Sequence, residues 1–185
     1  GVPEKGWNGD WSVFGTVTGT IKNLTFEGTK LSANNGVVGG VCLTLDAGRI
    51  DNVHVKNADL VGHTVGGIAK SMTGNAAINN CTVEGAIKYG GNKNNTPLGG
   101  IVGSISGQGA CKIDNCINYA SIADTSGKAN KIGGIVAMIE STGVQIKQCS
   151  NYGALSMTTE TTGQETGIGG IVALHTKRSD NSDIK

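Results

Sequence analysis

The stretch 98–117 decides the fold, because it holds the two short motifs that recur along the chain. The first motif is a pair of glycines followed by a β-branched residue. The second is an isoleucine two positions before an asparagine. The stretch reads Leu98-Gly99-Gly100-Ile101-Val102-Gly103 and then Ile113-Asp114-Asn115-Cys116.

Both motifs recur, and they alternate strictly. The glycine motif stands at Gly39-Gly40-Val41, Gly66-Gly67-Ile68, Gly99-Gly100-Ile101, Gly133-Gly134-Ile135 and Gly169-Gly170-Ile171. The asparagine motif stands at Ile21-Lys22-Asn23, Ile50-Asp51-Asn52, Ile78-Asn79-Asn80, Ile113-Asp114-Asn115 and, with glutamine in place of asparagine, Ile146-Lys147-Gln148. Residues 13–17 fit a first copy of the glycine motif in which the glycine pair is replaced. The pairs begin at residues 39, 66, 99, 133 and 169, so the period is 27, 33, 34 and 36 residues, which predicts a repeat architecture.

The repeats are built from strands rather than helices. Their segments are short, rich in Val and Ile, and bounded by Gly, Asn and Thr. Each repeat predicts one strand after the glycines, a second near Ile113, and a third near 120–123, with equivalents at 86–88 and 154–156. Equivalent strands of successive repeats would stack about 4.8 Å apart. The expected fold is all-β: a right-handed parallel β-helix (β-solenoid) of about five to six coils, with roughly three short strands per coil, although the residues themselves do not determine the handedness.

The order Gly-Gly-Ile-Val-Gly-x-Ile followed by Ile-x-Asn-Cys resembles the GLUG repeats of bacterial surface and secreted proteins. The resemblance extends over about residues 13–174, with alanine replacing the trailing glycine at Ala137 and Ala173. It implies an adhesin-like β-solenoid that lies outside the bacterial cell or on its surface. Such repeats also resemble accessory regions of IgA-specific metallopeptidases, where they lie outside the catalytic domain.

Composition limits the function classes. The formal net charge is +1, so we expect no nucleic-acid partner, and no apolar run reaches about 18 residues, so we expect no membrane insertion by this segment. Aromatic residues make up only 4% of the chain, which predicts an aliphatic core. We expect an N-terminal cap over residues 1–12, with Trp7 and Trp11, the repeats over 13–174, and a polar, mobile tail over 175–185.

The asparagine of the second motif has a structural explanation. Asparagine tolerates the left-handed backbone conformation better than most residues, and its amide can bond an equivalent amide one coil away. The motif therefore predicts a side-chain ladder at one corner of the coils. Its members are Asn23, Asn52, Asn80, Asn115 and Gln148.

The five cysteines align with small apolar residues. Cys81, Cys116 and Cys149 take the place of Leu24 and Val53. The other two align in the same way, Cys42 with Ala69 and Val102, and Cys111 with Ala76 and Val144. All five are therefore expected to be buried free thiols.

No catalytic site, metal site or cofactor is predicted. The three histidines share no repeat position. Asp51 and Asp114 share one, but two coils separate them, which places them about 10 Å or more apart. The chain is therefore not expected to be an enzyme.

The segment between the asparagine motif and the next glycine pair varies most in length, and insertions in repeat proteins often form the recognition edge. Tyr119 and Tyr152 are aligned and are expected to stack beside this edge. The function expected is a non-catalytic interaction module, surface-exposed or secreted, that binds a glycan or a host or extracellular protein. Two alternatives remain. The loops are solvated and have no partner, or the chain is an accessory solenoid of a larger secreted enzyme. The candidate binding residues are Tyr89, Asn92, Lys93, Asn95, Tyr119, Lys128, Tyr152, Thr159 and Glu160.

Overall fold

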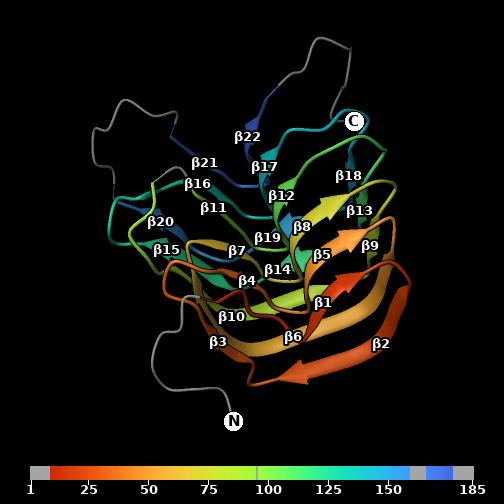
Figure 1. Cartoon of the computed structure of the whole chain (residues 1–185), viewed down its shortest axis with the longest axis horizontal. Coiled ribbons are helices and arrows are strands. Elements are labelled where there is room, and N and C mark those ends of the chain that lie inside the picture. Colours follow the sequence, from red (N-terminus) through yellow and green to blue (C-terminus); the bar gives the residue numbers. More distant parts are fainter. Residues whose placement is uncertain (1–8, 95, 159–165, 177–185) are drawn as a thin grey trace.

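The computed structural model describes residues 9–94, 96–158 and 166–176. Every regular element in this part of the chain is a β-strand, and the strands form sheets of six, eleven and five strands. All the strand pairs are parallel, as in the pairing of β1 with β5 and of β12 with β17. The all-β architecture with parallel sheets that the sequence predicts is therefore confirmed (Figure 1).

The six-stranded sheet contains the strand that follows each glycine motif. The register confirms that residues 13–17 are a first copy, because Phe14 lies beside Cys42. Cys42 in turn lies beside Ala69, and Ala69 beside Val102, as the repeat alignment predicts. In spatial order the strands are β1 (Phe14–Val17), β5 (Cys42–Asp46), β8 (Ala69–Thr73), β12 (Val102–Ile105), β17 (Val136–Ile139) and β22 (Val172–His175).

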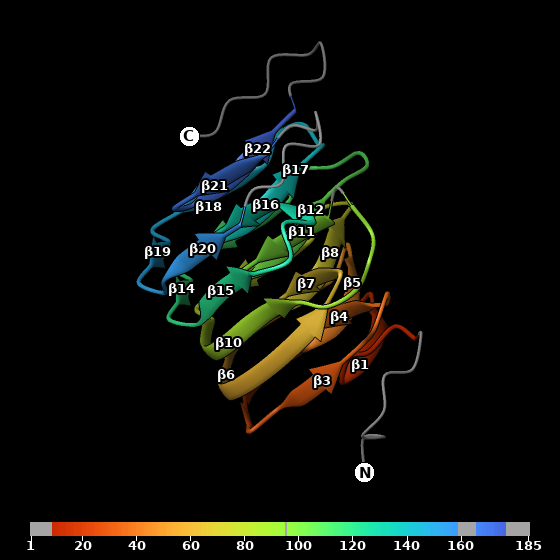
Figure 2. The same cartoon turned by 90° about the vertical axis from the view of Figure 1, so that its left-hand side faces the viewer.

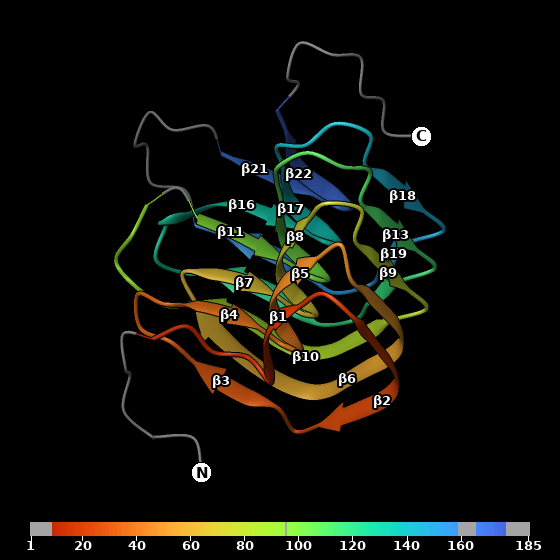
Figure 3. The same ribbon diagram turned by 45° about the vertical axis from the view of Figure 1, so that its right-hand side comes forward.

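The eleven-stranded sheet carries the asparagine motifs and curves strongly, as β2 and β6 show in Figure 3. Later repeats divide this region into three short strands, where the sequence predicts two, near Ile113 and near 120–123. In the second repeat, however, β6 runs unbroken, because its bends at Asn52 and Asn57 leave it paired on both sides. The strands are β2 (Thr20–Glu27), β3 (Lys30–Ser32), β6 (Arg49–Gly62), β9 (Ala77–Asn79), β10 (Thr82–Tyr89), β13 (Lys112–Asp114), β14 (Ile117–Asn118), β15 (Ser121–Asp124), β18 (Gln145–Lys147), β19 (Ser150–Asn151) and β20 (Leu155–Met157).

The five-stranded sheet leads into each glycine pair, and each of its strands ends on the first glycine. The chain passes from the six-stranded sheet to the eleven-stranded sheet, then to the five-stranded sheet, and then into the next repeat. Equivalent strands rise in order from the N-terminal to the C-terminal repeats, as β3, β6, β10, β15 and β20 show in Figure 2. The five strands are β4 (Val37–Gly39), β7 (Thr64–Gly66), β11 (Thr96–Gly99), β16 (Ala129–Gly133) and β21 (Gly167–Gly169).

The glycine pair is required by the close approach of backbone atoms. A Cβ atom on Gly99 would clash with the carbonyl oxygen of Val102, and a Cβ atom on Gly100 would clash with the carbonyl oxygen of Gly134 in the next repeat. Since neither residue has a left-handed φ, glycine is needed here for space and not for backbone conformation.

The core consists of aliphatic columns that run along the stack of repeats. Ile50, Ile78 and Ile113 are fully buried and lie beside one another in register. Trp11 is paired with Val38 and packs against this core, whereas Trp7, with the rest of residues 1–8, lies outside the described residues. Most of the expected tail, residues 177–185, also lies outside them. The core residues of one repeat are thus covered in part by the equivalent residues of its neighbours.

We predict that Gly134→Ala destabilises the protein far more than Gly170→Ala. The new methyl group at position 134 would clash with the Gly170 carbonyl and with the side chain of Asn151, whereas a Cβ on Gly170 meets nothing within 4 Å. Overpacking of this kind costs about 1–3 kcal/mol or more, and an unopposed surface change costs roughly 0.5 kcal/mol or less. Urea unfolding of the two variants, followed by circular dichroism, measures the difference, and equal losses of stability would contradict the steric explanation.

Candidate functional site

The five residues predicted to form the corner ladder all have the left-handed backbone conformation. Their φ values lie between 50° and 58°. Asn52 donates to Asn23 and Asn115 donates to Asn80, each from Nδ2 to Oδ1 at 2.9 Å. Gln148 shares the backbone conformation, but within the described residues no hydrogen bond joins it to Asn115. The corner ladder thus consists of two amide pairs.

The continuous ladder that the sequence predicts is wrong at its middle step. Asn80 Nδ2 donates to Asp51 Oδ1 at 2.9 Å, and not to Asn52. The Asn52 Oδ1 atom instead lies 3.1 Å from Nε2 of His54. A carboxylate is a stronger acceptor than an amide oxygen, so the Asn80 amide bonds Asp51, which stands one position before Asn52.

A second asparagine pair, which the sequence analysis missed, lies at the next corner of the same sheet. Asn118 is fully buried, and its Nδ2 donates to Asn151 Oδ1 at 2.8 Å and to the carbonyl of Ala120 at 3.0 Å. Its Oδ1 accepts the backbone N–H of Ala120 at 3.1 Å. The recurring Asn-Tyr dipeptide at 118–119 and 151–152 is the signal that marks this corner.

Tyr119 and Tyr152 follow these asparagines and form a stacked pair. Their ring centroids are 5.5 Å apart, with 16° between the ring planes, as the alignment of the repeats predicts. Tyr119 is 48% exposed and Tyr152 is 70% exposed. Their backbone N–H groups donate to Val83 and Asn118, both at 2.8 Å. The pair is therefore an exposed aromatic surface on a backbone that is hydrogen-bonded to the neighbouring repeats.

The tyrosine pair does not lie beside the variable loops, contrary to expectation. Tyr119 precedes β15, whereas the loop 125–128 follows that strand. The four residues of β15 span roughly 13 Å. The predicted single binding edge is thus two separate surfaces, because β15 runs between them.

The first variable loop, residues 90–94, is tied to the two preceding repeats. The backbone N–H of Asn92 donates to Asn35 Oδ1 at 2.7 Å, and the Tyr89 hydroxyl donates to the carbonyl of Lys93 at 2.7 Å. Lys93 Nζ lies 3.4 Å from His63 Nε2, and burial, followed by the charge of Lys93, lowers the pKa of His63. Tyr89 packs against the core and is only partly exposed.

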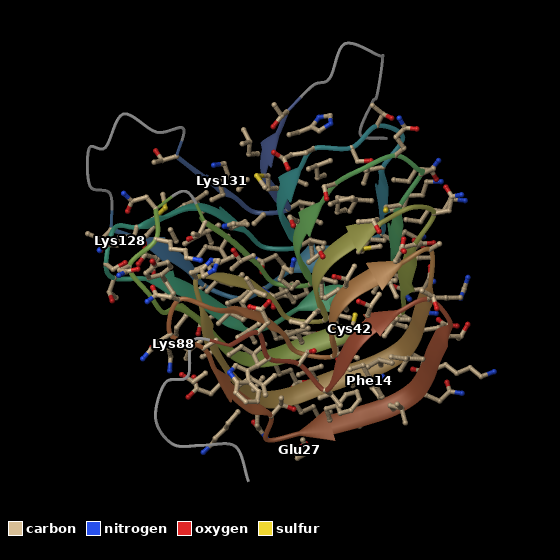
Figure 4. The ribbon with its side chains drawn as sticks, in the orientation of Figure 1. Phe14, Glu27, Cys42, Lys88, Lys128 and Lys131 are labelled. Carbon is tan, nitrogen blue, oxygen red and sulfur yellow. The ribbon has the colours of Figure 1, made fainter. Side chains whose placement is uncertain are left out.

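The second variable loop is organised by a buried carboxylate. Asp124 is 2% exposed and accepts the backbone N–H groups of Ser126 and Ala129, both at 2.7 Å. Lys128, half-buried in this loop, lies on the same side of the molecule as Lys88 and Lys131 (Figure 4). The remaining candidates, Asn95, Thr159 and Glu160, lie outside the described residues.

The five cysteines are all free, and four of them are buried. Cys81, Cys116 and Cys149 stack in consecutive repeats, and each thiol donates to the carbonyl two residues earlier, at 3.0, 3.3 and 3.1 Å respectively. The expectation of full burial is wrong only for Cys149, which is partly exposed. No described repeat covers the outer side of this last thiol.

The thiols differ in acidity. Burial raises the pKa of Cys42 to about 12 and raises the pKa of Cys111. The pKa of Cys149 is lowered, chiefly by the hydrogen bond with Cys116. Cys149 therefore combines a lowered pKa with access to solvent, which is the combination that makes a thiol reactive.

We predict that Cys149 alone reacts with a thiol reagent while the protein is folded. Because the thiolate is the nucleophile and the pKa of Cys149 is lowered, its reaction should become fast below pH 9.0, the ordinary thiol value. Iodoacetamide labelling followed by peptide mass spectrometry measures each cysteine, with Cys149→Ser as the control. Equal labelling of all five cysteines in the folded protein would show that the core opens readily.

The described residues contain no group of three or more His, Cys, Asp or Glu side chains arranged to hold a metal ion. No helix in that part of the chain is long and apolar enough to cross a membrane. No protein-family model, curated protein or solved structure matches the chain.

Proposed function

We propose that the chain is a right-handed parallel β-helix of about five to six coils. The repeated passage through the three sheets in one order supports this proposal, as does the constant register between equivalent strands. Right-handedness is the expected choice, because crossovers between parallel strands of one sheet are right-handed in about 98% of cases.

We further propose that this β-helix is a non-catalytic interaction module of the adhesin type, secreted or on the bacterial cell surface, and that it binds glycans. The resemblance to GLUG repeats supports the location and the class. The observation that carries glycan binding is the exposed tyrosine stack of Tyr119 and Tyr152. An aromatic face carries partial negative charge and accepts the polarised C–H groups of a sugar ring.

Rigidity favours the tyrosine stack as a recognition surface. A tyrosine has few rotatable bonds, so it provides a large contact area at a low cost in conformational entropy. Here the backbone beneath it is also held, by the amide pair of the buried Asn118 and the half-buried Asn151. Tyr152 presents the more open ring, at 70% exposure.

We predict that Tyr152→Ala and Tyr119→Ala each weaken glycan binding by about tenfold or more, as expected for an aromatic residue at the centre of a binding surface. A glycan array identifies the ligand, and titration calorimetry measures its affinity. Tyr89→Phe is the matched control, because it removes only the bond to Lys93 in a different loop. If wild type and both alanine variants bind the same glycans with equal affinity, the tyrosine stack is not the binding surface.

A further inference from the structure

A polar hollow lies on the outer face of the eleven-stranded sheet, away from both surfaces described above. It has a volume of about 230 Å³ and is formed over the neighbouring strands β9, β13 and β18, which lie side by side in Figure 3. Only one of the residues around it is apolar. The lining residues are Asn79, Lys112, Ile113, Asp114, Gln145 and Lys147.

The charged side chains around the hollow form no ion pair with one another in the described part of the chain. Lys112 and Asp114 lie two positions apart on β13 and so point to the same face, and Lys147 lies beside Asp114 in register. Among the described residues, the ion pairs are Arg49 with Asp51 and Lys88 with Asp59, and none involves these three side chains. The hollow is therefore bordered by one carboxylate and two ammonium groups that remain available to a ligand.

Two polar atoms at the hollow lack hydrogen-bond partners. Asp114 Oδ1 and Asn79 Nδ2 are buried, and neither has a partner among the protein atoms. Such atoms are rare in folded proteins and call for an explanation. Asn79 lies beside Asp114 in register, so one ligand group above the two strands can contact both the amide and the carboxylate. A hydroxyl group satisfies both, because it donates to the carboxylate and accepts from the amide.

We propose that this hollow binds an acidic sugar residue of a glycan. The sugar carboxylate lies between the ammonium groups of Lys112 and Lys147, and a ring hydroxyl bonds Asp114 and Asn79. Gln145 offers both a donor and an acceptor to a further hydroxyl. This inference rests on the proposed glycan binding and narrows its ligand to acidic glycans.

The two lysines determine how binding responds to salt. Both are exposed, so their attraction for a carboxylate is screened over a Debye length of about 10 Å at 0.1 M salt. Affinity for an acidic glycan should therefore fall as salt is added, while affinity for a neutral glycan should not.

Calorimetric titration of the whole chain with matched sugars tests the inference. The probes are a galacturonic acid hexasaccharide, a hyaluronan hexasaccharide and sialyllactose, each compared with its carboxyl-reduced counterpart. We expect at least one acidic probe to bind about tenfold or more tightly than its reduced form. Lys112→Gln and Lys147→Gln should each abolish that preference.

Lys22→Gln is the matched control, because Lys22 occupies the position equivalent to Lys147 in the first repeat and lies outside the hollow. It removes the same charge and should keep the preference for the acidic probe. A loss of preference in all three variants would show a general charge effect and overturn the site.

The remaining outcomes separate this inference from the proposed function. Equal affinities for the acidic and reduced sugars overturn the acidic site but leave tyrosine-dependent glycan binding intact. Failure of every sugar, acidic or neutral, on the probes and on the glycan array overturns both. A third outcome is that a polyglutamate peptide binds through Lys112 and Lys147 while no acidic sugar binds. That result overturns the acidic sugar as the ligand and shows that the hollow binds an acidic polypeptide.

Discussion

The carbonyl of each second glycine lies against the second glycine of the preceding repeat, in the space where a side chain would otherwise stand. This contact recurs from Gly40 to Gly67, Gly100, Gly134 and Gly170. It brings the backbones of successive repeats together at one corner and sets their register. The five-stranded and six-stranded sheets meet at this corner, so the close approach of its backbones lies between them.

Because the register is constant, the residues at equivalent positions of successive repeats lie in a column along the stack. The type of side chain in a column determines which interaction its members make. Isoleucines gain burial, asparagines exchange hydrogen bonds, and tyrosines stack their rings. Charged residues require a different solution, because like charges directly opposite one another are destabilising. The middle position of the asparagine motif forms one such column. No two neighbours in it carry the same charge, since its members are in order Lys22, Asp51, Asn79, Asp114 and Lys147.

The features that the sequence predicts correctly are those that arise from equivalence between repeats. Register, left-handed corners, the alignment of the cysteines and the stacking of Tyr119 on Tyr152 all belong to this class, because they follow from the register between successive repeats. The features that it does not predict depend on local competition: Asn80 bonds Asp51 rather than Asn52, and Asn118 turns inward. The hollow at Asp114 is also not predicted by the sequence, because Asn79, Asp114 and Lys147 hold the middle position of the asparagine motif, whose chemistry changes from one repeat to the next.

The fold of the first variable loop has a consequence for cooperativity. In an ideal repeat protein each unit contacts only its neighbours, so opening can begin at either end and spread stepwise. Asn92, however, bonds Asn35 across the intervening repeat, and Lys93 contacts His63 within that repeat. The N-terminal three repeats are thereby linked beyond nearest neighbours, which favours their opening together in local unfolding.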